Sequence, residues 1–335
     1  MQLPLFKLAV FSLLGAVLTG LASRPWVLRE SFLMGTTLRV SVSADSRKTG
    51  LQAIDSVFAA VRQVDDVLND WRSDTELARV NHAIPGEVLP LDPVLWGYLQ
   101  EVAEWTRLTG GTFDPGIGSL VDAWDLRGVG RYPDGATLGE ARSRSGLLRF
   151  ALTHGTVRRP DRGSWIDAGG FGKGAALRAA RNRLRQSGVA EAILNFGGQI
   201  LVLGDTTLIA EVAHPRQRFH PVARLRLRQA SASTTSQSER FIEVAGRRLG
   251  HVLDPRTGVP VANWGSVTVV HPDPMVADIL STALFVMGPD EGMRWLEGRG
   301  VAALFLVLEG DAVESRWSPE MQQILSTLPP ASRGH

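Results

Sequence analysis

The order of helix-like and strand-like patterns constrains the fold more than any other feature of this 335-residue chain. Apolar residues recur at spacings of three and four over residues 51–68, which predicts an amphipathic helix. Residues 31–43 instead alternate apolar and polar residues after Gly35, as a half-buried strand does. Because both patterns recur without strict alternation, we expect an α+β fold: a single compact two-lobed domain with mixed or antiparallel sheets flanked by helices.

Other segments supply the remaining expected elements. We expect a short helix capped by Ser73 or Asp74, a helix over residues 94–108 and a functional loop over residues 112–118. Residues 127–162 are polar and weakly patterned, which favours a connection over the surface. Further strands are expected at residues 192–196, 199–204, 208–212, 222–227, 241–244, 266–270 and 301–308, and a further helix at residues 175–187.

The charge balance gives no support for binding nucleic acid. Lys and Arg number 36 against 34 Asp and Glu, so the formal net charge is only +2 despite a sequence pI near 9.4. Hydrophobic residues make up 44% of the chain, which is ample for a sizeable core.

The N-terminus has the outline of a secretory signal. A short polar stretch ends at Lys7, residues 8–18 are apolar and residues 19–23 are mostly small, so we expect residues 1–23 to be a signal peptide or an N-terminal anchor. The chain has no cysteine, which excludes a lipoprotein and disulfides. We expect one domain over residues 24–325, a flexible tail over residues 326–335, and a location on the periplasmic side of the bacterial inner membrane.

A late apolar segment carries oxygen ligands at helical spacing. Asp278, Ser281 and Thr282 would lie on one helix face, where one carboxylate and two hydroxyls suit a hard cation such as magnesium. The alternative is an amphipathic helix with a solvated edge.

Earlier segments could bind an anion or a flat ring. The glycine-rich stretch from Asp167 to Gly174 could cradle a phosphate, with Lys173 adding positive charge, or could serve only tight packing. Met34 and Trp71 are candidate walls for a ring, or ordinary core residues. His251 could position a phosphate or move a proton, or be structural.

The succession of these segments resembles the ApbE-type FAD:protein FMN transferases over about residues 30–310. The segments that carry the resemblance are Met34-Gly35-Thr36, Trp71 with residues 73–77, Gly111 to Pro115, Ile166 to Gly174, Asn195 to Gly198, Thr235-Ser236, His251 to Gly258, and Ala277 to Thr282. The order of eight loose motifs is hard to obtain by chance.

The resemblance implies a magnesium-dependent exported enzyme that cleaves FAD at its pyrophosphate. It would attach FMN through a phosphoester to a Thr or Ser hydroxyl of an exported or membrane-bound redox protein, and release AMP. By resemblance, the metal would be held by Asp278, Ser281, Thr282 and the carbonyl of Gly170. FAD contacts would fall on Met34, Trp71, Thr112, Phe113, Asp114, Asp167, Lys173, His251 and Val252.

Several points stay open at this level. The general base would be His251 or Asp254. Ser281 stands where some members have a second carboxylate, Gln199 where an acidic residue is common, and Gln237 where glycine is common. The alternative functions are a magnesium-dependent FAD pyrophosphatase that releases FMN and AMP, and a non-catalytic exported FAD-binding protein.

Overall fold

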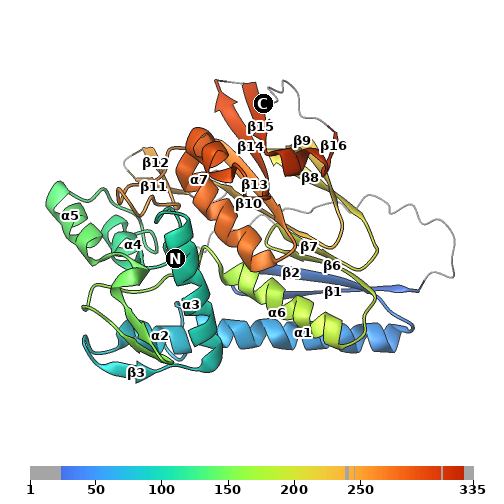
Figure 1. Ribbon diagram of the computed structural model, residues 1–335, viewed down its shortest axis with the longest axis horizontal. Coiled ribbons are helices and arrows are strands. Elements are labelled where there is room, and N and C mark those ends of the chain that lie inside the picture. The colour runs from blue at the N-terminus through green and yellow to red at the C-terminus, as the bar shows by residue number, and fades with distance from the viewer. Residues whose placement is uncertain (1–23, 238–240, 245, 311, 328–335) are drawn as a thin grey trace.

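A computed structural model describes residues 24–237, 241–244, 246–310 and 312–327. Its centre is an eight-stranded sheet in the order β1-β2-β6-β7-β10-β13-β14-β15, in which every neighbouring pair is antiparallel (Figure 1). The strands are β1 (Trp26–Leu33), β2 (Thr36–Ser43), β6 (Glu191–Phe196), β7 (Gln199–Leu203), β10 (Ser231–Ser236), β13 (Gly265–His271), β14 (Ala302–Glu309) and β15 (Ala312–Trp317).

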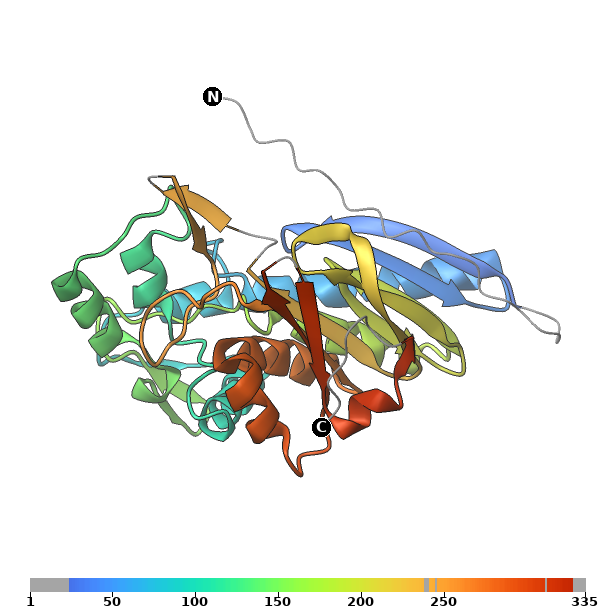
Figure 2. The ribbon, with the colours of Figure 1, turned by 90° about the horizontal axis from the view of Figure 1, so that it is seen from above.

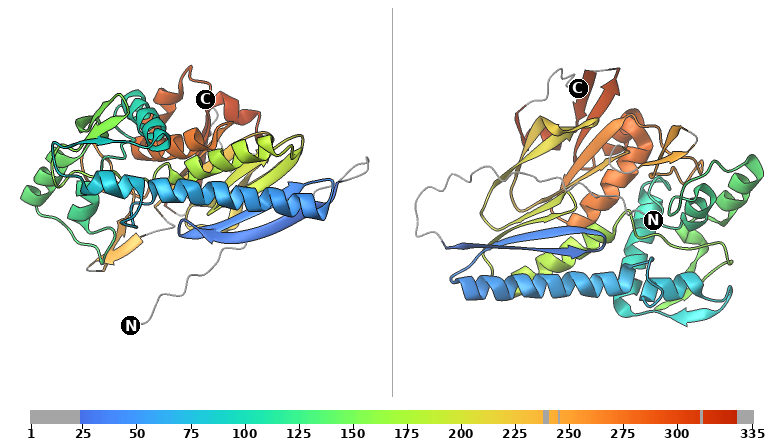
Figure 3. Two further views of the ribbon diagram at one scale, coloured as in Figure 1. Left: turned by 90° about the horizontal axis from the view of Figure 1, so that it is seen from below. Right: turned by 180° about the vertical axis from the view of Figure 1, so that it is seen from behind.

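Both faces of the central sheet are covered. The helices α1 (Arg47–Leu68) and α6 (Gly172–Gln186) run side by side under one face, and α7 (Pro274–Leu296) packs on α6, β10 and β13 (Figure 3). A small antiparallel sheet of β8 (Leu208–His214), β9 (Gln217–Leu227) and β16 (Leu325–Thr327) adjoins the other face.

The strand β7 shows why its sequence reads as a continuous apolar run. Leu201 and Leu203 belong to the hydrophobic cluster formed with α1 and α6, whereas Ile200 and Val202 belong to the cluster formed with β8 and β9. Successive side chains of a strand point to opposite faces, so a strand buried on both faces needs apolar residues at every position.

A second lobe packs beside the helical layer. It contains α2 (Glu76–His82), α3 (Pro93–Leu108), α4 (Gly118–Trp124), α5 (Gly135–Arg144), the turn η1 (Leu147–Arg149), and the strands β3 (Val88–Pro90), β4 (Ala151–Thr153) and β5 (Thr156–Arg158). The hairpin of β11 (Phe241–Val244) and β12 (Arg247–Gly250) projects from this side of the molecule (Figure 2). A short helix, α8 (Pro319–Gln322), precedes β16.

The α+β prediction, with antiparallel sheets flanked by helices, is confirmed, but several local predictions differ from the structure. The short helix α2 is capped by Thr75, whose hydroxyl accepts from the N–H of Ala78 at 3.1 Å, and not by Ser73 or Asp74. Met34 lies in the β1–β2 hairpin turn, so residues 31–43 form parts of two strands. The predicted surface connection at 127–162 is wrong, because this segment contains α5, η1, β4 and β5.

The predicted segments at the two ends of the chain lie mostly outside the described residues. The predicted signal or anchor at 1–23 lies outside the described residues, as do residues 328–335 of the predicted tail. Residues 326–327 of that tail belong to β16, which pairs with β9. Among the described residues, none of the helices has the length and apolar content that crossing a membrane requires.

Candidate functional site

The N-terminal ends of α6 and α7 meet at the glycine-rich segment. A Cβ on Gly174 would lie 2.6 Å from the Cα of Met275, so only glycine allows this approach. Asp273 caps α7 and forms ion pairs with Arg178 at 2.8 Å and Arg181 at 2.9 Å, both on α6. The result is that Asp278, one turn into α7, lies against the start of α6.

Asp278 is buried among hydroxyl groups. Its Oδ2 accepts from the N–H of Gly174 at 2.9 Å, and its Oδ1 accepts from Ser233 Oγ at 3.2 Å. Ser281 Oγ lies 2.8 Å from Thr235 Oγ1 and donates to the carbonyl of Asp278 at 2.9 Å. We call Ser233, Thr235 and Ser281, together with Asp278, the hydroxyl cluster; the side chain of Asp278 is only 6% exposed.

A cation could approach this cluster from the side of the glycine loop. Lys173 Nζ lies 3.9 Å from Asp278 Oδ1, and Thr282 Oγ1 lies 3.6 Å from the place a Cβ on Gly170 would take. Ser281 is instead fully buried behind Asp278. The predicted ligands Asp278, Thr282 and Gly170 are therefore brought together, while Ser281 lies deeper.

The donor set fits magnesium better than a metal that needs a full protein cage. Within the described ranges, no group of three or more His, Cys, Asp or Glu could hold a metal ion. One carboxylate with hydroxyl and carbonyl oxygens suits a hard cation that keeps water and substrate phosphate among its ligands. The predicted oxygen-only site is chemically reasonable on this geometry.

The glycine loop offers fewer free amides than an anion cradle requires. The N–H groups of Phe171 and Gly172 both donate to the carbonyl of Ala168, at 3.2 and 2.8 Å. Those of Gly169 and Gly174 donate to the carboxylates of Asp167 and Asp278. These amides stabilise the loop itself, so the side chain of Lys173 is the main positive group that the loop presents.

The start of the glycine loop is held by an arginine. Arg127 Nη2 donates to Asp70 Oδ2 at 2.7 Å and to Asp167 Oδ2 at 2.8 Å. Its guanidinium carbon lies 4.4 Å from the ring centroid of Trp71 and 4.3 Å from that of Trp165. We call these five residues the arginine cluster.

Asp70 is the unusual acid of the arginine cluster. Burial, and then the nearby charge of Asp167, raise the pKa of Asp70 from 3.8 to about 6, although Arg127 opposes the change. Asp70 Oδ2 also accepts from the N–H of Ala168 at 3.3 Å, which ties the turn after α1 to the glycine loop.

The predicted residues Met34 and Phe113 contact the glycine loop through apolar atoms. Met34 Cε lies 3.5 Å from the place of a Cβ on Gly172, and Phe113 Cε2 lies 3.3 Å from that of a Cβ on Gly170. Trp71, by contrast, is 71% exposed, so it is not the core residue that the alternative interpretation required.

The polar groups of Thr112 and Asp114 serve their own loop. Thr112 Oγ1 donates to the carbonyl of Thr109 at 3.0 Å. Asp114 Oδ1 accepts from the N–H groups of Gly116 at 2.7 Å and Leu147 at 2.8 Å, and burial raises its pKa. Thr112 Oγ1 and Asp114 Oδ1 are therefore engaged in contacts that stabilise this loop.

The turn that carries His251 and Val252 is fixed by Gln237. Gln237 Nε2 donates to the carbonyls of Val252 at 2.9 Å and Val261 at 3.1 Å, and its Oε1 accepts from the N–H of Val252 at 3.1 Å. A Cβ on Gly250 would lie 2.3 Å from the Cδ of Gln237, so the glutamine fills the space above this glycine.

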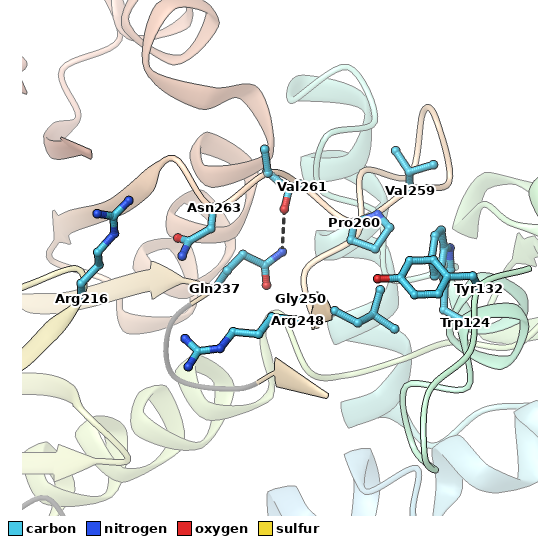
Figure 4. A pocket seen from close by; sticks show the side chains of 12 residues that line it. Trp124, Tyr132, Arg216, Gln237, Arg248, Gly250, Val259, Pro260, Val261 and Asn263 are labelled. Carbon is cyan, nitrogen blue, oxygen red and sulfur yellow. Dashed lines mark hydrogen bonds between the residues drawn. The ribbon is translucent and has the colours of Figure 1, made fainter. Parts of the chain in front are cut away.

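Gln237 also lines an open pocket of about 580 Å³ (Figure 4). Trp124 and Tyr132, in edge-to-face contact at 5.8 Å, lie at one end of it, and Arg216 lies at the other. Neither Asp278 nor Lys173 lines this pocket, so the pocket neighbours the hydroxyl cluster through Gln237 and β10 and does not contain it.

The two candidate bases differ in their surroundings. The carboxylate of Asp254 pairs with Arg256 Nη2 at 3.0 Å and accepts from the N–H of Arg256 at 2.9 Å. Arg256 also pairs with Glu291 at 2.7 Å. His251 is exposed on the same turn.

Sequence reasoning missed Arg127, Asp70 and Trp165. Arg127 contacts Asp70 and Asp167, which lie 57 and 40 positions away in the sequence, and no local sequence pattern predicts these contacts. Ser233 had a weak signal, because it lies in the hydroxyl-rich stretch from Ser231 to Ser236.

Comparisons with known proteins show the family to which this chain belongs. A family model described as the ApbE family matches residues 34–305. The FAD:protein FMN transferase of Klebsiella pneumoniae (strain 342) is 27% identical over 310 residues, which cover 87% of this chain and 87% of that protein. That of Rhodobacter capsulatus is 29% identical over 94% of this chain and 61% of that protein. The crystal structure of the ApbE protein from Thermotoga maritima covers 90% of this chain and 100% of its own, with a TM-score of 0.83 at 25% identity.

Proposed function

Because the chain belongs to the ApbE family, we propose that it is an FAD:protein FMN transferase. Relatives that align with most of this chain carry that name. The observation that supports the proposal best is the contact of α7 with the glycine loop, which brings the Asp278 carboxylate to the N–H of Gly174 and within 3.9 Å of Lys173 Nζ. A carboxylate that can bind a metal ion and an ammonium that can pair with a phosphate oxygen together suit a metal-bound pyrophosphate.

Magnesium would be held by the carboxylate of Asp278, the hydroxyl of Thr282 and the carbonyl of Gly170. When bound, it would neutralise charge on the pyrophosphate during phosphoryl transfer. We assign Ser281 a supporting role, since its Oγ is fully buried and bonded to Thr235 and to the carbonyl of Asp278.

The protein's own groups would position FAD and move one proton. Lys173 would pair with a phosphate oxygen, and Met34 and Phe113 would provide apolar contacts beside it. The hydroxyl oxygen of an acceptor Thr or Ser would attack the FMN-side phosphorus, the bond to the bridging oxygen would break, and AMP would leave.

We infer that His251 accepts the proton of that hydroxyl. Of the two candidate bases, the carboxylate of Asp254 is already engaged by the guanidinium and the N–H of Arg256. An imidazole is suited to proton transfer near neutral pH.

We propose that the acceptor is an exported or membrane-bound redox protein, and that the transferase acts on the periplasmic side of the bacterial inner membrane. The support is the sequence of residues 1–23, whose apolar stretch is flanked by Lys7 and by small residues. Detection of the mature N-terminus in a periplasmic or membrane fraction would test this location.

The activity is tested by incubating the protein with FAD, Mg²⁺ and a candidate acceptor, and then measuring the acceptor's mass. We expect stoichiometric covalent FMN on a Thr or Ser and an equal amount of AMP. Free FMN with AMP and an unmodified acceptor would instead identify a pyrophosphatase. FAD that stays bound and unchanged for hours would identify a non-catalytic binding protein.

A further inference from the structure

We propose that Arg127 is a positioning residue that sets the affinity of this protein for FAD, because it holds Trp71 and Asp167 in place at the start of the glycine loop. The inference deepens the proposed function and rests on it. It concerns binding of the substrate, and not the transfer step.

The contacts of Arg127 connect three separate segments. Its guanidinium is bonded to Asp70 in the turn after α1 and to Asp167 in the glycine loop, while Arg127 itself follows α4. Its Nη1 also donates to the carbonyl of Asp70 at 3.2 Å. One side chain therefore contacts all three segments at once and adds to the direct hydrogen bond between Asp70 and the N–H of Ala168.

The aromatic contacts explain how an exposed tryptophan can be ordered. Trp71 is 71% exposed, and the guanidinium lies 4.4 Å from its ring centroid. On the other side of the cluster, Trp165 is anchored by a hydrogen bond from its Nε1 to Asp122 Oδ2 at 2.8 Å. Arg127 thus connects the exposed indole of Trp71 to the anchored indole of Trp165. A ring that is already held in position binds a flat ligand with less loss of conformational entropy.

The electrostatics make Arg127 hard to replace. Two carboxylates, of Asp70 and Asp167, surround one guanidinium, and the side chain of Asp70 is only 6% exposed. Without the arginine these carboxylates would repel each other and approaching phosphates. A lysine would keep the charge, but its compact ammonium cannot pair with two acids and also cover aromatic faces.

The arginine cluster lies away from the groups that we assign to the chemical step. Asp70 and Asp167 bond to the N–H groups of Ala168 and Gly169, whereas Asp278 and Lys173 lie at the other end of the loop. Loss of Arg127 should therefore weaken FAD binding more than it slows the chemical step.

The test is a titration of FAD, followed by flavin fluorescence polarisation without acceptor, for wild type, Arg127→Ala and Arg127→Lys. Arg131→Ala is the matched control, because Arg131 is in the same segment but its side chain donates to the carbonyls of Ala123 and Asp122 and not to the arginine cluster. We expect Kd to rise about tenfold for Arg127→Ala, less for Arg127→Lys and not for Arg131→Ala. The kcat at saturating FAD should stay within about threefold of wild type.

A double-mutant cycle tests whether Arg127 acts through Trp71. If it does, Trp71→Ala and Arg127→Ala will have a combined effect on Kd smaller than the product of the single effects. An unchanged Kd in folded Arg127→Ala, or a lower kcat at unchanged Kd, would overturn the inference. Failure of the wild type to bind FAD would instead overturn the proposed function.

Discussion

The two ends of the glycine loop are both acidic, but they use their carboxylates differently. At the start, Asp70 and Asp167 share one guanidinium at 2.7 and 2.8 Å, so each carboxylate is engaged by a positive group of the protein itself. At the end, Asp278 accepts hydrogen bonds from Gly174 and Ser233, and the Nζ of Lys173 lies 3.9 Å from its Oδ1. The first arrangement fixes a surface, whereas the second leaves negative charge for a ligand.

Burial alone therefore does not identify the reactive carboxylate. The side chains of Asp70 and Asp278 are each 6% exposed. Asp70 has a close ion pair with Arg127 that belongs to the fold, whereas Asp278 has hydrogen bonds from uncharged groups and only a long ion pair with Lys173.

Removal of the carboxylate at the far end of the loop should have the largest effect. We expect Asp278→Ala to lower turnover by roughly 100-fold or more, because the main anionic ligand of the site is lost. Asp278→Asn, which keeps the shape, should lose similar activity. Covalent FMN on an acceptor is the measurement, and near-normal yield in either variant would refute the metal assignment.

Removal of the Gln237 side chain, which holds the turn that carries His251, should have the second largest effect. Gln237→Ala leaves one N–H and two carbonyls without their partner, so we expect a loss of about 1–3 kcal/mol in unfolding free energy. We also expect turnover to fall about tenfold as the His251 turn loosens. Gln322→Ala is the control, since Gln322 is an exposed glutamine that bonds Trp317. Equal effects of the two variants would show that Gln237 has no particular role at this turn.

A second carboxylate in the hydroxyl cluster should make the protein depend on magnesium. We expect Ser281→Asp to lower the unfolding free energy by about 1–3 kcal/mol without metal, because two buried carboxylates repel each other. Mg²⁺ should restore part of this loss, which thermal unfolding with and without the ion would reveal. Ser281→Asn is the uncharged control, and a Tm insensitive to Mg²⁺ in Ser281→Asp would place the cation elsewhere.

The smallest effect should be the pH dependence of the arginine cluster. The pKa of Asp70 is about 6 in the folded protein against 3.8 ordinarily, so between these values the folded state keeps a proton that the unfolded state has lost. This group's contribution to stability therefore falls as pH rises from 3.8 to about 6. Relative to Asp70→Asn, the wild type should lose stability over that window in denaturant titrations, and parallel curves would exclude the shift.

The sequence predicted the parts of this molecule that depend on local periodicity. The α+β class follows from patterns such as that of residues 51–68, which lie within α1. The position of Asp278 and Thr282 on one helix face follows from helical spacing. The proximity of Thr282 to Gly170 was expected only from the family resemblance.

What could not be predicted depends on long-range contacts. Arg127 donates hydrogen bonds to acids that lie 57 and 40 residues away in the sequence. Asp114 accepts a hydrogen bond from the N–H of Leu147, which lies 33 residues further along the chain. The helix α5 in the weakly patterned segment 127–162 was not predicted. Only Ala141 of that helix is buried, so its sequence has almost no apolar stripe.

The fit of Gln237 over Gly250 restricts how the sequence can evolve. A Cβ at position 250 would lie 2.3 Å from the Cδ of Gln237, so a larger residue there requires the glutamine to leave its hydrogen bonds, whereas a shorter residue at position 237 would open this space. The two positions therefore form an epistatic pair: a change of Gly250 is better tolerated after, or together with, a change of residue 237. A library that randomises both positions should recover larger residues at 250 only in clones that have lost Gln237.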